Sequence, residues 1–162
     1  MIFGFGKISP TVVRPLRADK AQECAAIHAS GFAYPWSPAE IAAMIGGPNN
    51  VGAAALDPAS GELRGFVISR VAADEAEILT IAVRKAMRGK GIAGQLLQHH
   101  VARLAEGGVR ALFLEVDDAN APALALYRRH GFAPVGERPG YFRARDAAPG
   151  NALIMRKPLA PQ

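Results

Sequence analysis

The sequence contains a single cysteine, Cys24, among its 162 residues, so it can form neither an internal disulfide nor a cysteine-based metal cage. No apolar run approaches the roughly 20 residues that cross a bilayer, and Gly4, Gly6 and Lys7 interrupt the opening segment before a secretory hydrophobic region could form. These absences exclude small disulfide-stapled secreted scaffolds and most structural zinc folds. We therefore expect a cytoplasmic protein with no membrane contact, held together by core packing.

The composition indicates one folded domain. Apolar residues make up 50% of the chain and charged residues 20%, which supplies enough material for a core and argues against disorder. The length leaves no room for a second core of ordinary size. We expect an N-terminal extension at residues 1–10, a single domain at 11–158 and a C-terminal tail at 159–162.

Positive charge exceeds negative charge, with a formal net charge of +5 and a sequence pI of about 9.8. This balance suggests an anionic partner, such as nucleic acid or a phosphorylated cofactor, without choosing between them. The basic residues are concentrated at residues 84–90, which contain Arg84, Lys85, Arg88 and Lys90 and no acidic residue.

Apolar periodicity and turn residues predict alternating strands and helices over most of the chain. The predicted strands cover residues 11–14, 51–56, 63–71, 76–83, 110–116, 132–136 and 152–157, and the predicted helices cover 20–29, 38–45, 91–106 and 120–130. This order mixes hairpins with crossover helices. It therefore predicts an α/β fold (α+β mixed sheet), in which a central mixed β-sheet is flanked by helices on both faces.

Local signals mark the ends of several of these elements. Asp19 is predicted to cap the first helix, and Pro15 to end the first strand. Ser-Pro-Ala-Glu at residues 37–40 forms a capping box, and Asn120 is predicted to cap the last helix. Residues 31–36, between the first two helices, are expected to form an aromatic loop.

A glycine-bearing basic turn, residues 88–93 with the sequence Arg-Gly-Lys-Gly-Ile-Ala, lies between a predicted buried strand and a predicted helix. Its glycines let the backbone approach a ligand, while the first helical turn offers free N–H groups and the positive end of the helix dipole. Those features suit a pyrophosphate. The residues form neither of the common nucleotide-binding motifs, so from them alone a solvent-exposed basic loop is an equally good interpretation.

Glu115 and Tyr127 are the candidate chemical groups. Glu115 is the polar residue in the otherwise apolar predicted strand at 111–116, where a carboxylate needs either an exposed position or a polar pocket. Tyr127 lies seven positions after Asn120 on the same predicted helix, so the two share a face. Spacing alone favours a solvent-facing glutamate and a core tyrosine over a catalytic pair.

Several motifs, taken in chain order, resemble those of the GNAT acyl-CoA-dependent N-acetyltransferases. They are Ile78-Leu79-Thr80-Ile81-Ala82-Val83, Arg88-x-x-Gly91-x-Ala93, Leu114-Glu115-Val116 and Asn120-x-x-x-x-Ala125-Leu126-Tyr127-x-x-x-Gly131-Phe132. Within that superfamily, Tyr34-Pro35-Trp36-Ser37, Asp74-Glu75-Ala76 and Ala152-Leu153-Ile154-Met155 are similar to segments of the RimI-type ribosomal-protein-alanine N-acetyltransferases. The resemblance spans about residues 11–158 and implies the GNAT acyl-CoA N-acyltransferase fold.

The resemblance also implies a chemistry, namely direct transfer of acetyl from acetyl-CoA to an amine, with Glu115 as general base, Tyr127 as general acid and no metal. The main chain of 81–83 would hold the pantetheine arm and thioester, the backbone amides of 88–94 would cradle the pyrophosphate, and Asn120 would bind near the pantetheine. The implied cofactor-binding set is Ile81, Ala82, Val83, Arg88, Gly89, Lys90, Gly91, Ile92, Ala93, Gly94 and Asn120.

The implied acceptor is a protein N-terminal α-amine, with the N-terminal alanine of a small ribosomal protein as the specific candidate. An α-amine has a pKa of about 8 and a lysine side chain one of about 10.4, so the α-amine gives up its proton more easily to a carboxylate base. Tyr34, Trp36 and Tyr141 are the candidate walls of the acceptor groove. The chain departs from the RimI type around Tyr141-Phe142-Arg143 and Gly150-Asn151-Ala152. Arg138, Arg143 and Arg145 make residues 138–145 a basic loop of open role.

Two alternative functions stay open at this point. The same machinery could acetylate a lysine or a small-molecule amine, or the chain could be a non-catalytic acyl-CoA or ribosome/RNA-binding module. Direct nucleic-acid binding is not expected of the enzyme. His99 and His100 have no partner at ligand spacing, so no metal site is expected, and Cys24 is assigned to packing. The residues do not identify the acceptor protein, its preferred first residue or the oligomeric state.

Overall fold

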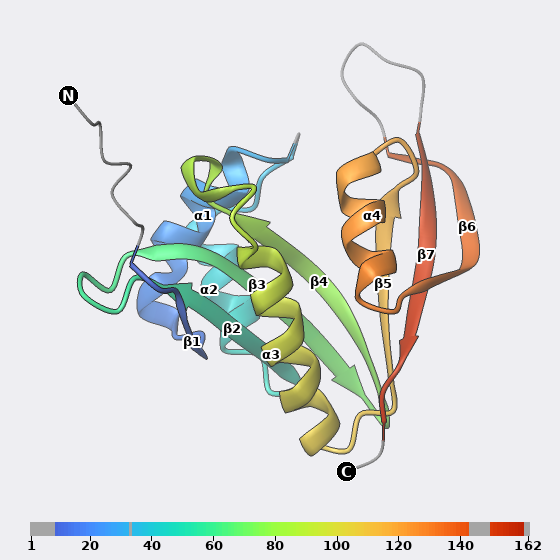
Figure 1. The fold of residues 1–162 in the computed structure, drawn as a ribbon, viewed down its shortest axis with the longest axis horizontal. Coiled ribbons are helices and arrows are strands. Elements are labelled where there is room, and N and C mark those ends of the chain that lie inside the picture. The colour runs from blue at the N-terminus through green and yellow to red at the C-terminus, as the bar shows by residue number, and fades with distance from the viewer. Residues whose placement is uncertain (1–8, 33, 143–149, 161–162) are drawn as a thin grey trace, which may run out of the picture.

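The computed structural model describes residues 9–32, 34–142 and 150–160, which form a seven-stranded sheet of order β1-β2-β3-β4-β5-β7-β6 (Figure 1). The strands are β1 (Val12–Pro15), β2 (Asn50–Leu56), β3 (Leu63–Ala72), β4 (Glu75–Val83), β5 (Ala111–Asp117), β6 (Ala133–Phe142) and β7 (Gly150–Pro158). Neighbouring strands run antiparallel, except that β4 and β5 are parallel. The predicted mixed sheet is confirmed.

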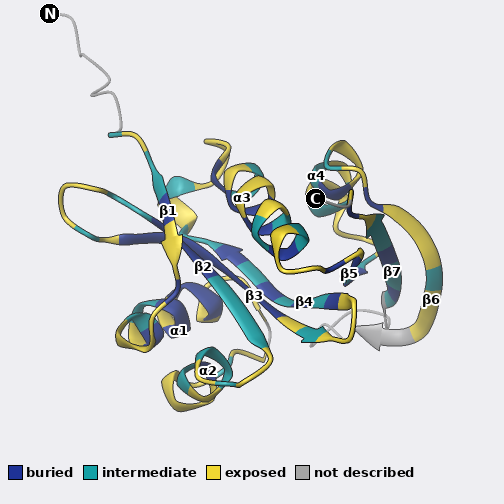
Figure 2. Cartoon of the chain, turned by 90° about the horizontal axis from the view of Figure 1, so that it is seen from below, coloured by how far each residue is buried: buried dark blue, intermediate teal, exposed yellow. Residues whose placement is uncertain are grey.

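Helices cover both faces of this sheet, as predicted (Figure 2). Helices α1 (Ala21–Ala29) and α2 (Pro38–Ile45) pack on one face, in a buried cluster that includes Ile41, Phe66 and Ile68. Helices α3 (Ile92–Glu106) and α4 (Ala121–Arg129) pack on the other face, in a larger cluster that includes Leu97 and Leu112. Two short 3-10 turns, η1 (Ala18–Lys20) and η2 (Lys85–Met87), precede α1 and follow β4.

The capping signals at α2 and α4 are confirmed. Ser37 Oγ accepts a hydrogen bond from the main-chain N–H of Glu40 at 3.1 Å, and the Glu40 carboxylate accepts one from the N–H of Ser37 at 3.4 Å. Asn120 Oδ1 accepts from the N–H of Ala123 at 3.3 Å. These bonds satisfy N–H groups that the first helical turn leaves without an intrahelical partner.

The first helix begins within one residue of its predicted start, but its predicted cap is wrong. Asp19 does not cap α1, because it lies within η1, and α1 begins after Lys20 without a side-chain cap. Lys20 Nζ instead donates to the Gly61 carbonyl at 2.8 Å, and Glu23 accepts from the main-chain N–H of Leu63 at 2.9 Å. Contacts with a distant turn therefore fix this end of the helix in place of a local cap.

Several strand boundaries also differ from the prediction, among them those of β1 and β6. Pro15 lies within β1, opposite Ala53, rather than after it. An edge strand accepts proline because one side of its backbone needs no ladder hydrogen bond. β6 continues past Gly136 to Phe142, with irregular pairing to β7 between Arg138 and Phe142. β6 is also an edge strand, so it accepts Pro134 and Pro139 for the same reason.

Candidate active site

The site begins where two parallel strands part. β4 and β5 pair only over Glu75–Glu77 and Ala111–Phe113, and beyond those residues they diverge (Figure 1). Residues 81–83 keep β3 as their partner on one side. Their other edge faces the split, so their main-chain polar groups are available to an extended ligand. The family resemblance implies that the pantetheine arm binds along this stretch.

A β-bulge precedes that stretch. Ser69 pairs with Ile78 and Ile68 pairs with Thr80, so Leu79 is an extra residue in β4. A bulge reverses the side-chain alternation. Accordingly, Ile78 packs in the α3–α4 cluster and Ala82 in the α1–α2 cluster. The bulge thus reorients the backbone of β4 as it enters the split.

The turn between β4 and α3 has a backbone that only glycine adopts easily. Gly89 and Gly91 have φ of +75° and +79°, in the left-handed region. Gly91 is the N-cap of α3, so no side chain caps the helix, and the N–H groups of its first turn face away from the helix body. Ile92 is buried at 4% exposure, whereas Lys90 is exposed. The turn has the form of an anion site built from main chain.

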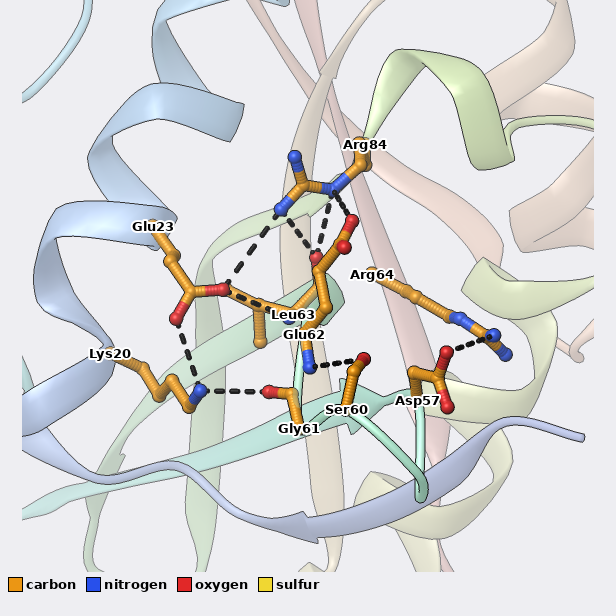
Figure 3. A network of polar contacts seen from close by, with 9 residues as sticks. All are labelled: Lys20, Glu23, Asp57, Ser60, Gly61, Glu62, Leu63, Arg64 and Arg84. Carbon is orange, nitrogen blue, oxygen red and sulfur yellow. Dashed lines mark hydrogen bonds and ion pairs between the residues drawn. The ribbon is translucent and has the colours of Figure 1, made fainter. Parts of the chain in front are cut away.

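Arg84, the residue directly after β4, anchors the start of this turn (Figure 3). Its Nε and Nη2 atoms donate to the Leu63 carbonyl at 2.9 and 2.8 Å, and it forms ion pairs with Glu62 at 3.3 Å and Glu23 at 4.0 Å. Burial favours a raised pKa for Glu23, but hydrogen bonds from Leu63 and Lys20 hold that pKa below its usual value. The charge of Arg84 is therefore compensated within the protein. The positive potential of the turn comes from the basic residues that follow it, Lys85, Arg88 and Lys90.

Arg88 and Gly94 connect the turn to its surroundings. Arg88 Nε donates to the Val83 carbonyl at 3.1 Å, which folds the side chain back on the end of β4. A Cβ on Gly94 would lie 3.0 Å from Nε2 of His130, so the first turn of α3 abuts the C-terminal end of α4. Ala93, between them, is half-buried.

Glu115 forms an ion pair that the sequence did not reveal. Its Oε1 atom lies 3.2 Å from Nη2 of Arg138, with side chains 16% and 56% exposed respectively. The guanidinium compensates the charge of a carboxylate that is largely removed from water. Arg138 belongs to β6, so the assignment of this residue to a basic loop is wrong. Arg143 and Arg145 lie outside the described residues.

Tyr127 is buried at 8% exposure on α4, with its ring edge toward Phe132 at a centroid distance of 5.7 Å. Burial raises the pKa of its hydroxyl to about 12. The phenol is therefore protonated throughout the neutral range and is available as a hydrogen-bond donor. Asn120, at the other end of α4, uses its side chain to cap the helix.

The two candidate catalytic side chains approach the sheet from opposite faces. Leu114 and Val116 belong to the same buried cluster as Tyr127. Side chains alternate along a strand, so Glu115, between them, points to the other face of β5. Glu115 lies in β5, one of the two strands that part, and Tyr127 lies on α4, which packs on the other face of the sheet.

The aromatic candidates for the acceptor groove lie in two places. Tyr34 is 73% exposed and Trp36 is half-buried, both in the loop between α1 and α2. Trp36 stacks on His28, a contact that sequence reasoning missed although His28 directly precedes the aromatic segment. Tyr141 lies in β6, but its side chain is outside the described residues.

Several other groups bear on the chemistry of the site. Within the described ranges, no group of three or more histidine, cysteine or acidic side chains is arranged to hold a metal ion. None of the helices there combines the length and apolar character that a membrane crossing requires.

Cys24 is fully buried, and burial raises the pKa of its thiol to about 12, so it is a poor nucleophile.

A hollow of about 310 Å³ lies between α1 and the segment that follows β4. It is lined by Ala26, Ile27, Ser30, Arg84, Lys85 and Ala86. Because Arg84 is already held by carboxylates, the split and the glycine turn remain the better candidate for the chemistry.

Residues 21–132 match the acetyltransferase (GNAT) family. The chain is 36% identical over 156 residues to the N-alpha-acetyltransferase RimI of Mycobacterium tuberculosis, which covers 91% of this chain and 92% of that protein. It is 33% identical over 137 residues to the ribosomal protein bS18-alanine N-acetyltransferase of Escherichia coli strain K12, covering 83% and 88%. The crystal structure of the ribosomal-protein-S18-alanine N-acetyltransferase from Escherichia coli superposes with a TM-score of 0.86 at 29% identity, covering 94% of this chain and 96% of that one.

Proposed function

Because this chain belongs to the acetyltransferase (GNAT) family, we propose that it acetylates the N-terminal α-amine of a protein, and specifically the N-terminal alanine of a ribosomal protein. The acetyltransferase activity itself follows from the family. The choice of acceptor is supported by similarity over nearly the whole chain to relatives named for N-alpha and bS18-alanine acetylation. The structural observation that carries the site assignment is the parting of β4 from β5 beside the uncapped start of α3.

The residues around the split fit acetyl-CoA. When bound, acetyl-CoA supplies an acetyl group activated as a thioester. We assign the free edge of residues 81–83 to the amide groups of its pantetheine arm. The main-chain N–H groups of 89–94 are assigned to the pyrophosphate, because the glycine N-cap of α3 offers them no side-chain acceptor and Lys90 adds exposed positive charge. The N–H of Arg88, which the resemblance included in this set, already donates to the Lys85 carbonyl at 3.3 Å.

Glu115 is assigned the role of general base, which accepts the proton that the acceptor amine must lose. An amine is nucleophilic only when neutral, and the carboxylate can take the proton directly or through a water. Arg138 holds that carboxylate in one orientation at 3.2 Å. Since Glu115 faces away from α4, the acceptor is placed on the side of the sheet that α1 and α2 cover over the neighbouring strands.

Tyr127 is assigned the role of general acid. Its hydroxyl keeps its proton at neutral pH because burial raises its pKa to about 12, so it can donate a hydrogen bond or a proton to the departing thiolate. With the base on one side of β5 and the acid on the other, amine entry and thiolate departure are separated in space. No covalent intermediate on the enzyme is needed.

Mass spectrometry of peptide products tests the acceptor assignment. Two peptides of one sequence, beginning with alanine and containing one lysine, are incubated with acetyl-CoA, one with a free N-terminus and one with a blocked N-terminus. The proposal requires acetyl label on the first residue of the free peptide and none on the blocked peptide. Label that persists on the blocked peptide would assign the activity to lysine instead.

A further inference from the structure

The loop between α1 and α2 is folded around one buried imidazole, that of His28. The His28 ring lies between Phe32 and Trp36, with ring centroids 4.0 and 4.6 Å away and interplanar angles of 6° and 13°. Nδ1 of His28 accepts a hydrogen bond from the main-chain N–H of Trp36 at 3.1 Å. Its carbonyl accepts from the N–H groups of Gly31 and Phe32 at 3.1 and 3.2 Å. One residue therefore holds both ends of the loop.

This arrangement requires a neutral ring. A ring nitrogen that accepts a hydrogen bond carries no proton, so the proton of His28 is on Nε2. Burial lowers the pKa of His28, while the carboxylate of Glu40, at the start of α2, acts in the opposite direction. A cation also lies beside the loop, since Nη2 of Arg88 would lie 3.2 Å from a Cβ on Gly31. Protonation of Nδ1 would turn this acceptor into a donor. It would then face the main-chain N–H of Trp36, a second donor, and the hydrogen bond between them would be lost.

The same loop joins the core to an exposed aromatic surface. His28 is 2% exposed, and Trp36 packs against the cluster under β2–β4. Phe32, although one face of its ring stacks on His28, is 43% exposed, and Tyr34 is 73% exposed, which leaves a large apolar area in contact with water. The loop thus presents aromatic rings at one side of the molecule and is fixed by a single buried residue beneath them.

We propose that His28 is a positioning residue for the acceptor: it holds Phe32 and Trp36 in the arrangement that receives the polypeptide carrying the amine. The inference rests on the proposed function, because it takes this loop as the acceptor side of the site. His28 touches no reacting atom and acts through the two rings stacked on it. Its loss therefore weakens acceptor binding and leaves the chemical step and the acetyl-CoA site unchanged.

Two substitutions separate the stacking from the hydrogen bond. His28→Phe keeps an aromatic ring between Phe32 and Trp36 and removes the acceptor atom. His28→Asn removes the ring, but its side-chain oxygen can take the place of Nδ1. Losing one buried hydrogen bond corresponds to about a tenfold change. We expect His28→Phe to raise the KM for the peptide acceptor about tenfold and His28→Asn to raise it less, with kcat and the acetyl-CoA KM within about twofold.

The matched control is His99→Asn on α3, because His99 is an exposed histidine distant from the loop in sequence. It should keep wild-type kinetic constants. An unchanged acceptor KM in both His28 variants, or an equal loss of kcat, would overturn the inference. Acetyl-CoA KM and far-UV circular dichroism identify a variant that fails to fold. In that case the wild-type fluorescence titration below decides the matter, and the absence of any acid transition there overturns the inference.

Trp36 provides that measurement, because it is the single tryptophan of the chain. A protonated imidazole stacked on an indole quenches its fluorescence, so wild-type emission should fall as the pH is lowered through a midpoint below 6.5. His28→Asn should abolish that transition and His99→Asn should retain it. A transition that survives in His28→Asn contradicts the inference. Failure of the wild-type enzyme to acetylate either peptide contradicts the proposed function alone, since the fluorescence result needs no substrate.

Discussion

Glu115 and Arg138 form the contact that bears most directly on catalysis, since the arginine fixes the orientation of the proposed base. Glu115→Gln keeps the shape of the side chain but cannot accept a proton. We expect kcat to fall about 100-fold, with the loss greatest at low pH, where the acceptor amine is most protonated. Steady-state rates measured from pH 6 to pH 9 check this. Arg138→Gln is the companion variant and should reduce kcat less, because the carboxylate remains; a wild-type rate in Glu115→Gln at neutral pH would remove its assignment as base.

Tyr127→Phe tests the other proposed catalytic group. Phenylalanine preserves the edge contact with Phe132 at the 5.7 Å centroid spacing, so the core packing is kept. We expect turnover to fall about 100-fold, because the variant has no proton to give to the departing thiolate. Calorimetry should show an unchanged affinity for acetyl-CoA, which separates a catalytic loss from a binding loss. Turnover equal to that of the wild type would rule out the acid role.

The turn at the start of α3 can be tested through its backbone. Gly91 has φ of +79° at the N-terminal end of α3 and Gly108 has φ of +92° after its C-terminal end, and nothing lies within 4 Å of a Cβ at either position. Alanine at either site should cost about 1 kcal/mol of unfolding free energy, because a left-handed conformation strains any residue with a Cβ. Only Gly91→Ala should also weaken acetyl-CoA binding. Urea unfolding and calorimetry on both variants measure the two effects, and equal affinities would contradict the placement of the pyrophosphate.

Local sequence predicts an element well where local contacts form it. The capping box at 37–40 and the Asn120 cap are confirmed because each is closed by bonds within one helical turn. The cap of α1 was mispredicted because Lys20 and Glu23, at the start of the helix, bond to residues about 40 positions away. The length of β6 was underestimated for the same reason, since β7 supplies the pairing that carries it past Gly136.

The candidate site follows the same distinction between local and distant contacts. The sequence alone points to the residues of the site that lie in recognisable local patterns. Two glycines, Gly89 and Gly91, lie between a predicted strand and a predicted helix. Glu115 is polar within an apolar strand, and Tyr127 belongs to a motif that resembles one of the family. The Arg138 contact with Glu115 depends on the insertion of β7, the last strand in the chain, between β5 and β6. No spacing rule reveals that order. The His28 stack likewise depends on how a loop closes, which composition alone does not specify.

The whole molecule should lose stability as the pH falls from 6.5 to 4, chiefly through a buried histidine. His100 is fully buried and shares a 2.7 Å hydrogen bond with Ser69 Oγ. Burial lowers its pKa to about 4 from the ordinary value of 6.5, with smaller contributions from Arg103 and His99. Between those values the unfolded chain binds a proton that the folded chain does not, so the free energy of unfolding decreases as the pH falls. Burial also lowers the pKa of His28 and His130, which adds in the same direction.

The two acids with lowered pKa act at the acid end of this range and below it. Glu23 and Asp57 stabilise the fold above their ordinary values of 4.5 and 3.8, and that contribution is lost as the pH falls through their lower folded-state values. His100→Gln isolates the histidine, because glutamine can reproduce the Nε2 contact with Ser69 and does not titrate. Urea unfolding should show wild-type stability falling by about 2 kcal/mol more between pH 7 and pH 5 than that of His100→Gln. His99→Gln, an exposed neighbour on the same helix, should behave as the wild type. An identical fall in His100→Gln would mean that other groups set the acid sensitivity of the fold.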